Sequence, residues 1–268
     1  IVGATGYAGA ELVRLLLQRD DVKIVGFGSK NFAGESYSRI FRSMYKYADN
    51  ICENDNVSKL SKKADIIFTA TPQGFLAENI NDEVLANAKV IDLSADFRIK
   101  DVDVYEKWYK LEHKSKGLIK EAVYGLPELY REEIKKARLV ANPGCYPTCS
   151  ILSLQPLLKH KLIDENSIII DAKSGTSGAG RSAKVDNLFC EVNENMKAYG
   201  IGSHRHTPEI EAQLSKAVGE DIVISFTPHL VPMMRGILVT AYASLKAGTT
   251  EEDIKNAYES EYANEKFI

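Results

Sequence analysis

The chain has 268 residues, of which 44% are hydrophobic and 26% are charged, and its formal net charge is −3. These values are ordinary for a globular protein and leave room for two domains or one large α/β unit. The absence of a basic stripe disfavours nucleic acid as a partner, and no apolar stretch approaches the length of a membrane span. Four cysteines without a disulfide framework fit a reducing compartment, so we expect a cytoplasmic protein.

The first half of the chain alternates short apolar runs with helical periods. Residues 8–20 have helical periodicity, with Leu12, Leu15 and Leu16 expected on one buried face. Alternation of strand and helix predicts a parallel sheet with helices on both sides, a Rossmann-type α/β domain. The expected buried strands are residues 22–28, 64–71, 88–94 and 137–141.

The second half has longer strands and one late helix. The runs 221–232 and 235–245 are separated by two residues, which favours a mixed or antiparallel sheet, and 167–175 adds another strand. Residues 249–264 begin with an acidic turn and predict a helix. We therefore expect a nucleotide-binding domain over residues 1–144 and a second α+β domain over residues 145–268.

A glycine-rich loop, "GATGYAG", joins the first predicted strand to the first predicted helix. Glycine lets the backbone approach a pyrophosphate closely, and a helix N-terminus offers free N–H groups to it. The spacing departs from G-x-G-x-x-G, but the strand–loop–helix context predicts a dinucleotide site. The predicted cofactor contacts in this loop are Gly3, Thr5, Gly6, Tyr7, Ala8 and Gly9.

The end of the next predicted strand indicates which dinucleotide binds. An NAD site usually has an acidic residue there for the ribose 2′-hydroxyl, whereas this chain has Ser29 and Lys30. A hydroxyl and a cation suit a 2′-phosphate, so we expect NADP(H).

Cys145, in "ANPGCYPT", lies where a predicted strand turns into a predicted helix. Pro147 suits a first helical turn, and a thiol at a helix start is favoured as the reactive thiolate. The position predicts a nucleophile. Cys149, four residues on, would share a helical face with it, but two cysteines are too few for a structural zinc site, so no metal is expected.

Several motifs together resemble the N-acetyl-γ-glutamyl-phosphate reductases of arginine biosynthesis. They occur in family order over nearly the whole chain: "GATGYAG", "DLSADFR", "ANPGCYPT", "SGTSGAGR", "HRHTPEI" and "HLVPMMRGI". The "HRHTPEI" segment disfavours the related aspartate-semialdehyde dehydrogenases. Two features depart from the family pattern: Cys149 stands where a small residue is usual, and Ile268 precedes a family helix that returns to the nucleotide domain. The start at "IVGATG", already within a predicted strand, also suggests that residues precede Ile1.

The resemblance implies the chemistry and the roles of particular residues. Cys145 would attack the acyl phosphate, and the resulting thioester would be reduced by NADPH to N-acetylglutamate 5-semialdehyde. Family position makes His206 the acid/base group, with His204 in support, and alternate residues of an extended segment face the same way. Thr207 is the expected N-cap of the next helix, whereas His113 and His160 lie in charged segments and are expected in solvent.

The resemblance also implies further binding residues. The expected substrate or phosphate ligands are Ser94, Arg98, Asn142, Arg205 and Glu209. The expected further cofactor contacts are Thr71, Pro72, Ser174, Gly175 and Gly178, the last three in a flexible polar loop.

Three alternatives remain from the sequence. One is the sibling reductase that acts on N-acetylaminoadipyl phosphate, or a carrier-bound analogue, in lysine synthesis. Another is an aspartate-semialdehyde dehydrogenase. The third is a non-catalytic NADP-binding redox sensor based on Cys145, which would need neither a histidine partner nor a phosphate-binding arginine. The family resemblance further implies a homodimer or homotetramer.

Overall fold

The computed structural model describes residues 1–268 and divides into two units, Ile1–Pro143 and Gly144–Ile268. No helix combines the length and apolar character needed to cross a membrane. The first unit contains α1 (Tyr7–Leu16), α2 (Tyr37–Ile40), the 3₁₀ helix η1 (Arg42–Met44), α3 (Val57–Ser61), β1 (Ile66–Thr69), α4 (Phe75–Asn79), α5 (Asp82–Asn87), β2 (Lys89–Asp92), α6 (Val102–Tyr109), α7 (Lys116–Ile119), β3 (Val123–Tyr124), α8 (Pro127–Lys136) and β4 (Leu139–Ala141).

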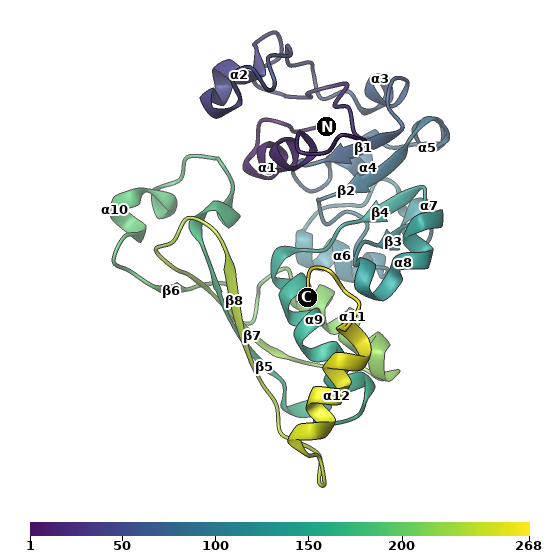
Figure 1. The fold of residues 1–268 in the computed structure, drawn as a ribbon, viewed down its shortest axis with the longest axis vertical. Coiled ribbons are helices and arrows are strands. Elements are labelled where there is room, and N and C mark those ends of the chain that lie inside the picture. The colour runs from purple at the N-terminus through teal and green to yellow at the C-terminus, as the bar shows by residue number, and fades with distance from the viewer. The chain divides into compact units, whose positions relative to one another are not determined.

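The sheet of the first unit is parallel and has the order β1-β2-β4-β3 (Figure 1). Val2 extends it through a parallel bridge to Thr69, and the amide of Gly28 donates to the carbonyl of Ile1 (2.7 Å). The predicted strands in 64–71, 88–94 and 137–141 are confirmed as β1, β2 and β4. The run 22–28 is not a regular strand: a single bridge pairs Gly28 with Glu53, and Val22 and Val25 are exposed.

The helix predicted over 8–20 is confirmed as α1, but its buried face differs from the expected one. Val13 is fully buried, Leu12 and Leu16 pack partly against the same core, and Leu15 is 49% exposed. The expectation for Leu15 was wrong, because successive helical residues are about 100° apart and Leu15 lies beyond the edge of the buried stripe.

The charged segment around His113 folds inward, contrary to the expectation of a solvated histidine. His113 is 2% exposed, and its ring lies edge-on to Phe97 and Tyr105. The amide of Ser115 donates to Nδ1 (3.2 Å), so Nε2 carries the proton and donates to the carbonyl of Asp96 (2.6 Å). Burial lowers the pKa of His113, which keeps the ring neutral.

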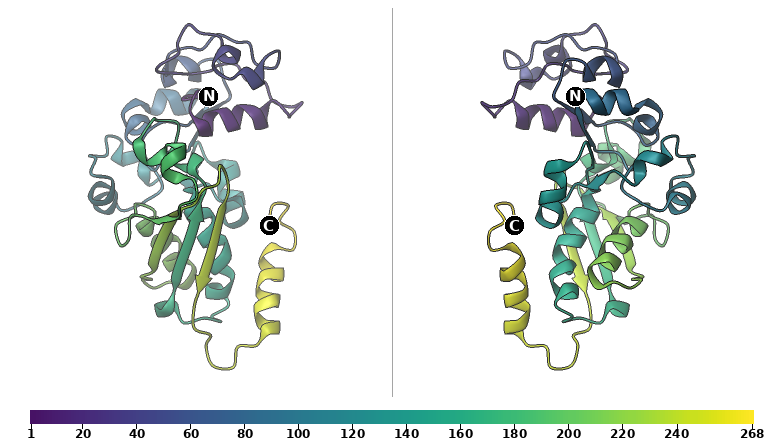
Figure 2. Two further views of the ribbon diagram at one scale, coloured as in Figure 1. Left: turned by 90° about the vertical axis from the view of Figure 1, so that its left-hand side faces the viewer. Right: turned by 90° about the vertical axis from the view of Figure 1, so that its right-hand side faces the viewer.

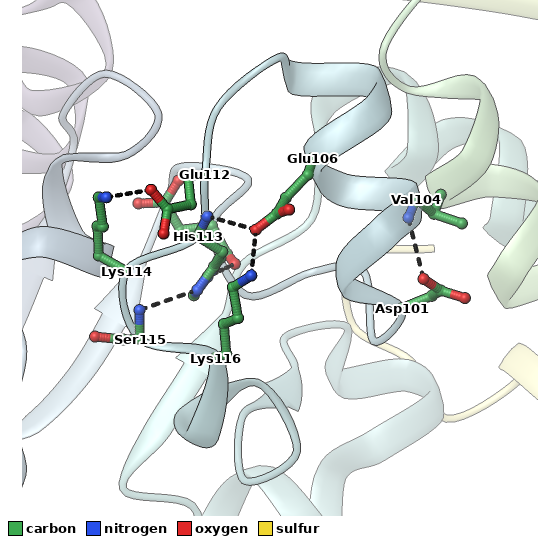
Figure 3. Close-up of polar contacts among 9 residues, drawn as sticks. Asp101, Val104, Glu106, Glu112, His113, Lys114, Ser115 and Lys116 are labelled. Atoms are coloured by element: carbon green, nitrogen blue, oxygen red, sulfur yellow. Dashed lines mark hydrogen bonds and ion pairs between the residues drawn. The ribbon is translucent and has the colours of Figure 1, made fainter.

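Charged residues surround His113 in the sequence, which explains why a position in solvent was expected. Glu106 accepts the amide of His113 (3.0 Å) and pairs with Lys116 (2.8 Å), as Figure 3 shows. Long charged side chains can cover a buried group while their ends stay in water. His160 is different: its side chain is 39% exposed and contacts Glu261.

The second unit contains α9 (Cys145–Lys159), the 3₁₀ helix η2 (Glu165–Ser167), β5 (Ile169–Ser174), η3 (Thr176–Ala179), η4 (Val185–Asn187), α10 (Phe189–Val192), β6 (Lys197–Ala198), α11 (Thr207–Val218), β7 (Ser225–Leu230), β8 (Ile237–Tyr242) and α12 (Glu251–Tyr262). Its sheet has the order β6-β7-β5-β8, with β5 parallel to β7 and antiparallel to β8. The mixed sheet is confirmed. Strands β7 and β8 do not pair despite their short connection, because β5 lies between them.

Helices cover one face of this sheet. The core combines Leu154 and Leu158 of α9, Ile210 and Leu214 of α11, and Ile170 of β5. Helix α12 packs on the outer side of α9 (Figure 2), where the Tyr262 hydroxyl donates to the carbonyl of Leu152 (2.9 Å). The predicted helix over 249–264 is confirmed, and Thr250 with Asp253 forms a capping box at its start.

Candidate active site

The glycine-rich turn of the first unit brings strand and helix into close contact. Gly3 has φ = +75°, and a Cβ there would lie 2.3 Å from the carbonyl oxygen of Ala70. A Cβ at Gly9 would lie 2.2 Å from the carbonyl oxygen of Gly3. Both positions therefore require glycine, and Gly6 is the N-cap of α1. This backbone arrangement is typical of a turn that accepts a pyrophosphate.

The residues predicted to select NADP lie close to this turn. The hydroxyls of Thr5 and Ser29 share a hydrogen bond (2.7 Å), and Ser29 Oγ also accepts the amide of Phe32 (3.2 Å). Ser29 is 1% exposed, whereas Lys30 is exposed. Thr71 lies beside Gly3, and its buried hydroxyl has no hydrogen-bond partner in the chain, which fits a group that contacts a bound nucleotide.

The loops after β2 and β4 bring three predicted ligands together. The hydroxyl of Ser94 donates to Asp92 Oδ2 (2.6 Å) and accepts the amide of Asp96 (3.2 Å). Asp92 also accepts the hydroxyl of Thr69 (2.7 Å), and its own carbonyl accepts the amide of Asn142 (2.8 Å). Burial raises the pKa of Asp92 to about 6.

Arg98 joins these two loops. Its Nε donates to the carbonyl of Asn142 (2.7 Å) and one Nη donates to the carbonyl of Leu93 (2.6 Å). The side chain is 8% exposed, so part of its donor capacity already holds the backbone that precedes the cysteine.

The second unit begins at the predicted nucleophile. Gly144 is the N-cap of α9, and Cys145 is the first helical residue and is exposed. The buried carboxylate of Glu209, in the first turn of α11, accepts the amide of Gly144 (2.9 Å). Glu209, predicted as a substrate ligand, thus holds the peptide next to the cysteine. The other helical cysteine, Cys149, is half-buried, and burial raises the pKa of its thiol.

Both predicted histidines lie at this helix start. A Cβ on Gly144 would be 2.6 Å from His206 Nε2, so the imidazole of His206 rests against the residue before Cys145. The rings of His204 and His206 are 4.9 Å apart, and His204 Nδ1 accepts the amide of His206 (3.1 Å). Burial and the nearby Arg205 lower the pKa of His204 to about 4.

The start of α11 differs by one residue from the expectation. His206, not Thr207, is the N-cap, and Thr207 is the first helical residue. Threonine is a common N-cap residue, but Pro208 fits the first helical turn with either start, so the sequence did not distinguish the two. Arg205 is exposed at the same turn.

Tyr146 packs between the histidines and the sheet. Its ring contacts both imidazoles and Phe226 edge-on, and its hydroxyl bonds to that of Tyr199 (2.9 Å). Sequence reasoning missed Tyr146, although its place directly after Cys145 could have indicated it.

Backbone hydrogen bonds hold the start of the loop after β5. The amide of Gly175 donates to the carbonyl of Gly236 (3.0 Å), and that of Thr176 to the carbonyl of Met233 (2.8 Å). A Cβ at Gly175 would lie 2.8 Å from the amide of Arg235, and one at Gly178 would lie 3.0 Å from Ser174 Oγ. Close backbone packing therefore explains glycine at Gly175.

Comparison with known proteins identifies both units. Residues 1–137 match the family described as "Semialdehyde dehydrogenase, NAD binding domain", and residues 145–268 match "Semialdehyde dehydrogenase, dimerisation domain". Aspartate semialdehyde dehydrogenase II from Vibrio cholerae has a similar fold, with a TM-score of 0.69 and 17% identity, over 97% of this chain and 77% of that one. The corresponding enzyme with NADP from Candida albicans gives a TM-score of 0.66 and 15% identity, over 96% and 74%. The fold is that of the semialdehyde dehydrogenases, a class of oxidoreductases with a nicotinamide dinucleotide cofactor.

Sequence similarity is closer to one branch of this class. N-acetyl-gamma-glutamyl-phosphate reductase from Lachnoclostridium phytofermentans is 59% identical over all of this chain and 78% of its own length. The enzymes of that name from Lachnospira eligens and Campylobacter jejuni (strain 81116) are 60% and 58% identical, over 78% and 77% of their lengths. The chain belongs to the N-acetyl-gamma-glutamyl-phosphate reductase family and is an oxidoreductase of arginine biosynthesis.

Proposed function

We propose that the chain catalyses the NADPH-dependent reductive dephosphorylation of N-acetyl-L-glutamyl 5-phosphate through a thioester on Cys145. The observation that carries the proposal is the exposed thiol at the first residue of α9, with the ring of His206 against the preceding Gly144. The positive end of a helix dipole favours a thiolate at this position, and an adjacent imidazole can accept its proton.

The chain's own residues divide the reaction into two steps. The thiolate of Cys145 attacks the acyl carbon, and the bond to phosphate breaks with release of inorganic phosphate. Bound NADPH supplies the hydride that reduces the thioester carbonyl. The resulting tetrahedral thiohemiacetal collapses to the aldehyde and expels the thiolate, while His206 holds and transfers the proton.

The surrounding residues have supporting roles in this proposal. His204 stays neutral and accepts the amide of His206, which fixes the position of the acid/base group. Glu209 holds the Gly144 peptide, and its place in the acyl-substrate site is proposed together with that of Arg205. Ser94, Arg98 and Asn142 are proposed to receive the departing phosphate, with Arg98 also orienting Asn142.

The cofactor is proposed to be NADP(H), bound at the turn from Gly3 to Gly9, and Ser174, Gly175 and Gly178 are proposed as further cofactor contacts. Because Ser29 is engaged with Thr5, exposed Lys30 carries most of the proposed preference for the 2′-phosphate. Lys30→Glu should raise the KM for NADPH with little effect on NADH. Equal use of both nucleotides before and after the change would contradict this assignment.

Turnover tests the nucleophile most directly. In the reverse direction, with semialdehyde, phosphate and NADP⁺, Cys145→Ser should lose nearly all activity but keep nucleotide affinity. Mass spectrometry should find the acyl adduct on Cys145 when hydride is withheld. The exposed Cys190 provides a matched control, because Cys190→Ser should remain active. An adduct on Cys149 or Cys190 instead would refute the assignment.

A homo-oligomer is also proposed, with the second copy covering the open face of the mixed sheet. Alternation along β5 and its pairing with β8 place Ile169, Leu238 and Tyr242 on this face, where they are 50%, 65% and 53% exposed. The match of residues 145–268 to a dimerisation domain supports pairing through the second unit, and the exposed apolar side chains favour this face of it. Leu238→Glu should lower the mass measured by light scattering to that of a monomer, whereas Tyr47→Glu, on the exposed surface of the first unit, should not. A monomeric wild-type chain would contradict the proposal.

A further inference from the structure

A carboxylate that the sequence did not indicate lies directly at the glycine-rich turn. Asp55 Oδ1 accepts the amide of Gly3 (2.8 Å), although the two residues are 52 positions apart. Burial raises the pKa of Asp55, and the nearby backbone and charge of Lys30 lower it in part. Asp55 therefore lies beside both the turn proposed to hold the pyrophosphate and the residue proposed to hold the 2′-phosphate.

The backbone around Asp55 directs the carboxylate to this place. Glu53 is bridged to Gly28, with its amide donating to the carbonyl of Phe27 (2.8 Å) and its carbonyl accepting the amide of Ser29 (2.7 Å). These bonds bring the segment that ends at Asp55 alongside the end of the 22–28 run.

Gly28 provides the space through which Asp55 reaches the turn. A Cβ at Gly28 would lie 2.6 Å from Asp55 Oδ1 and 3.1 Å from the carbonyl oxygen of Ile1. Any larger residue would push the carboxylate away from Gly3. The glycine here thus has a function separate from those in the "GATGYAG" loop.

We infer that Asp55 is a positioning residue for the dinucleotide: it holds the peptide of Gly3 in the arrangement that binds the cofactor. This inference rests on the proposed cofactor site. A carboxylate that accepts this amide resists rotation of the Gly3 peptide, and hydrogen bonds to charged groups are stronger than neutral ones. Because the amide of Gly3 is directed to Asp55, the carboxylate fixes the left-handed backbone of the turn before the nucleotide arrives.

A positioning role differs measurably from direct contact with the ribose. The Gly3 turn faces the pyrophosphate, which NADPH and NADH share, so a positioning residue should affect both affinities by a similar factor. A carboxylate in direct contact with the 2′-position of the ribose would instead affect the affinities for NADPH and NADH in opposite directions. Its removal would strengthen NADPH binding by relieving repulsion and weaken NADH binding by loss of a hydroxyl contact.

The experiment measures the Kd of NADPH and of NADH by fluorescence titration of the whole chain, without acyl substrate. Asp55→Ala should weaken both nucleotides by about 10-fold, as expected for loss of a hydrogen bond to a charged group. Asp55→Asn should weaken them less, because its amide oxygen can still accept from Gly3. In steady state, the KM for nucleotide should rise while the KM for phosphate stays constant.

Asp49→Asn is the matched control. Asp49 is also a carboxylate of the first unit that accepts a backbone amide, that of Lys46 (3.2 Å), but it is exposed. This variant should keep both dissociation constants. Gly28→Ala, which displaces the carboxylate of Asp55 without removing it, should reproduce the loss seen in Asp55→Ala, and the double variant should be no weaker than either alone.

The outcomes separate this inference from the proposed function. A wild-type chain that binds neither nucleotide would overturn the proposed cofactor site and the inference with it. Wild-type binding with unchanged affinities in Asp55→Ala and Asp55→Asn would overturn the inference alone, even if the unfolding temperature falls. Opposite changes for NADPH and NADH would also overturn it, in favour of direct contact with the ribose.

Discussion

Replacing His204 by asparagine should leave the shape of the pH–rate profile unchanged, because this histidine is already neutral at the pH of turnover. With its pKa lowered to about 4, only about one His204 side chain in a thousand carries a proton at pH 7. Burial is the main cause, since the ring packs among Tyr146, Tyr199 and Phe226, and the positive charge of Arg205 adds to it. A group that titrates near pH 4 cannot produce a limb in the imidazole range.

His206 should behave differently. Its ring rests against Gly144, next to the nucleophile, so His206→Asn should lower kcat by roughly 10²–10⁴-fold, the usual contribution of general acid/base catalysis. The same change should remove the limb near the imidazole range. His204→Asn should mainly raise the KM for the acyl substrate. Its effect on kcat should be small, because an asparagine oxygen can replace Nδ1 as the acceptor of the His206 amide, a bond worth about 1 kcal/mol.

The assay is kcat and kcat/KM from pH 5.5 to 9 for the wild type and both variants, in the direction of semialdehyde oxidation. His160→Asn is the control for replacing a histidine by asparagine outside the site, because His160 is partly exposed and its ring contacts Glu261. Histidine ring signals followed by NMR should show no titration of His204 above pH 5. If His204→Asn removes the limb while His206→Asn keeps it, the assigned roles are reversed and the reasoning from burial is wrong.

Three further predictions follow from the described contacts. Gly144→Ala should place a methyl group 2.6 Å from His206 Nε2 and so lower kcat while nucleotide Kd is unchanged; full activity would show that the imidazole can move aside without loss. Arg98→Lys replaces the planar guanidinium, whose separate nitrogens donate to two backbone carbonyls, with a single ammonium nitrogen, so the KM for phosphate should rise more than that for NADP⁺ in the reverse assay. A changed unfolding temperature with a constant phosphate KM would indicate a purely structural arginine. Asp92 has its pKa raised to about 6 from 3.8, so the folded state retains a proton that the unfolded state releases; the stability from this group is greatest below pH 4 and is lost as pH rises through 6. Between pH 5 and pH 8 the free energy of unfolding, measured with urea, should therefore fall by about 1.4 kcal/mol more in the wild type than in Asp92→Asn, and an equal fall in both proteins would contradict the raised pKa.

The sequence by itself determined the features that depend on neighbouring residues. Glycines at Gly3 and Gly9 predicted a turn from strand to helix, and the Pro-Gly pair before Cys145 predicted the start of α9. Apolar runs located β1, β2 and β4 because a strand buried on both faces needs a continuous apolar stretch. These features are local, so a short window of sequence carries the information for them.

Only the tertiary structure decided which distant residues meet and which charges lose water. Nothing in the spacing of Asp55 from Gly3, or of Glu209 from Gly144, indicates that their carboxylates accept those amides. The order of the second sheet, with β5 between β7 and β8, likewise depends on long-range pairing and not on the short connection. The buried, neutral state of His113 was hidden by its charged neighbours. A side chain's ionisation depends on the solvent and dipoles around it, and that environment exists only once segments far apart in sequence have packed together.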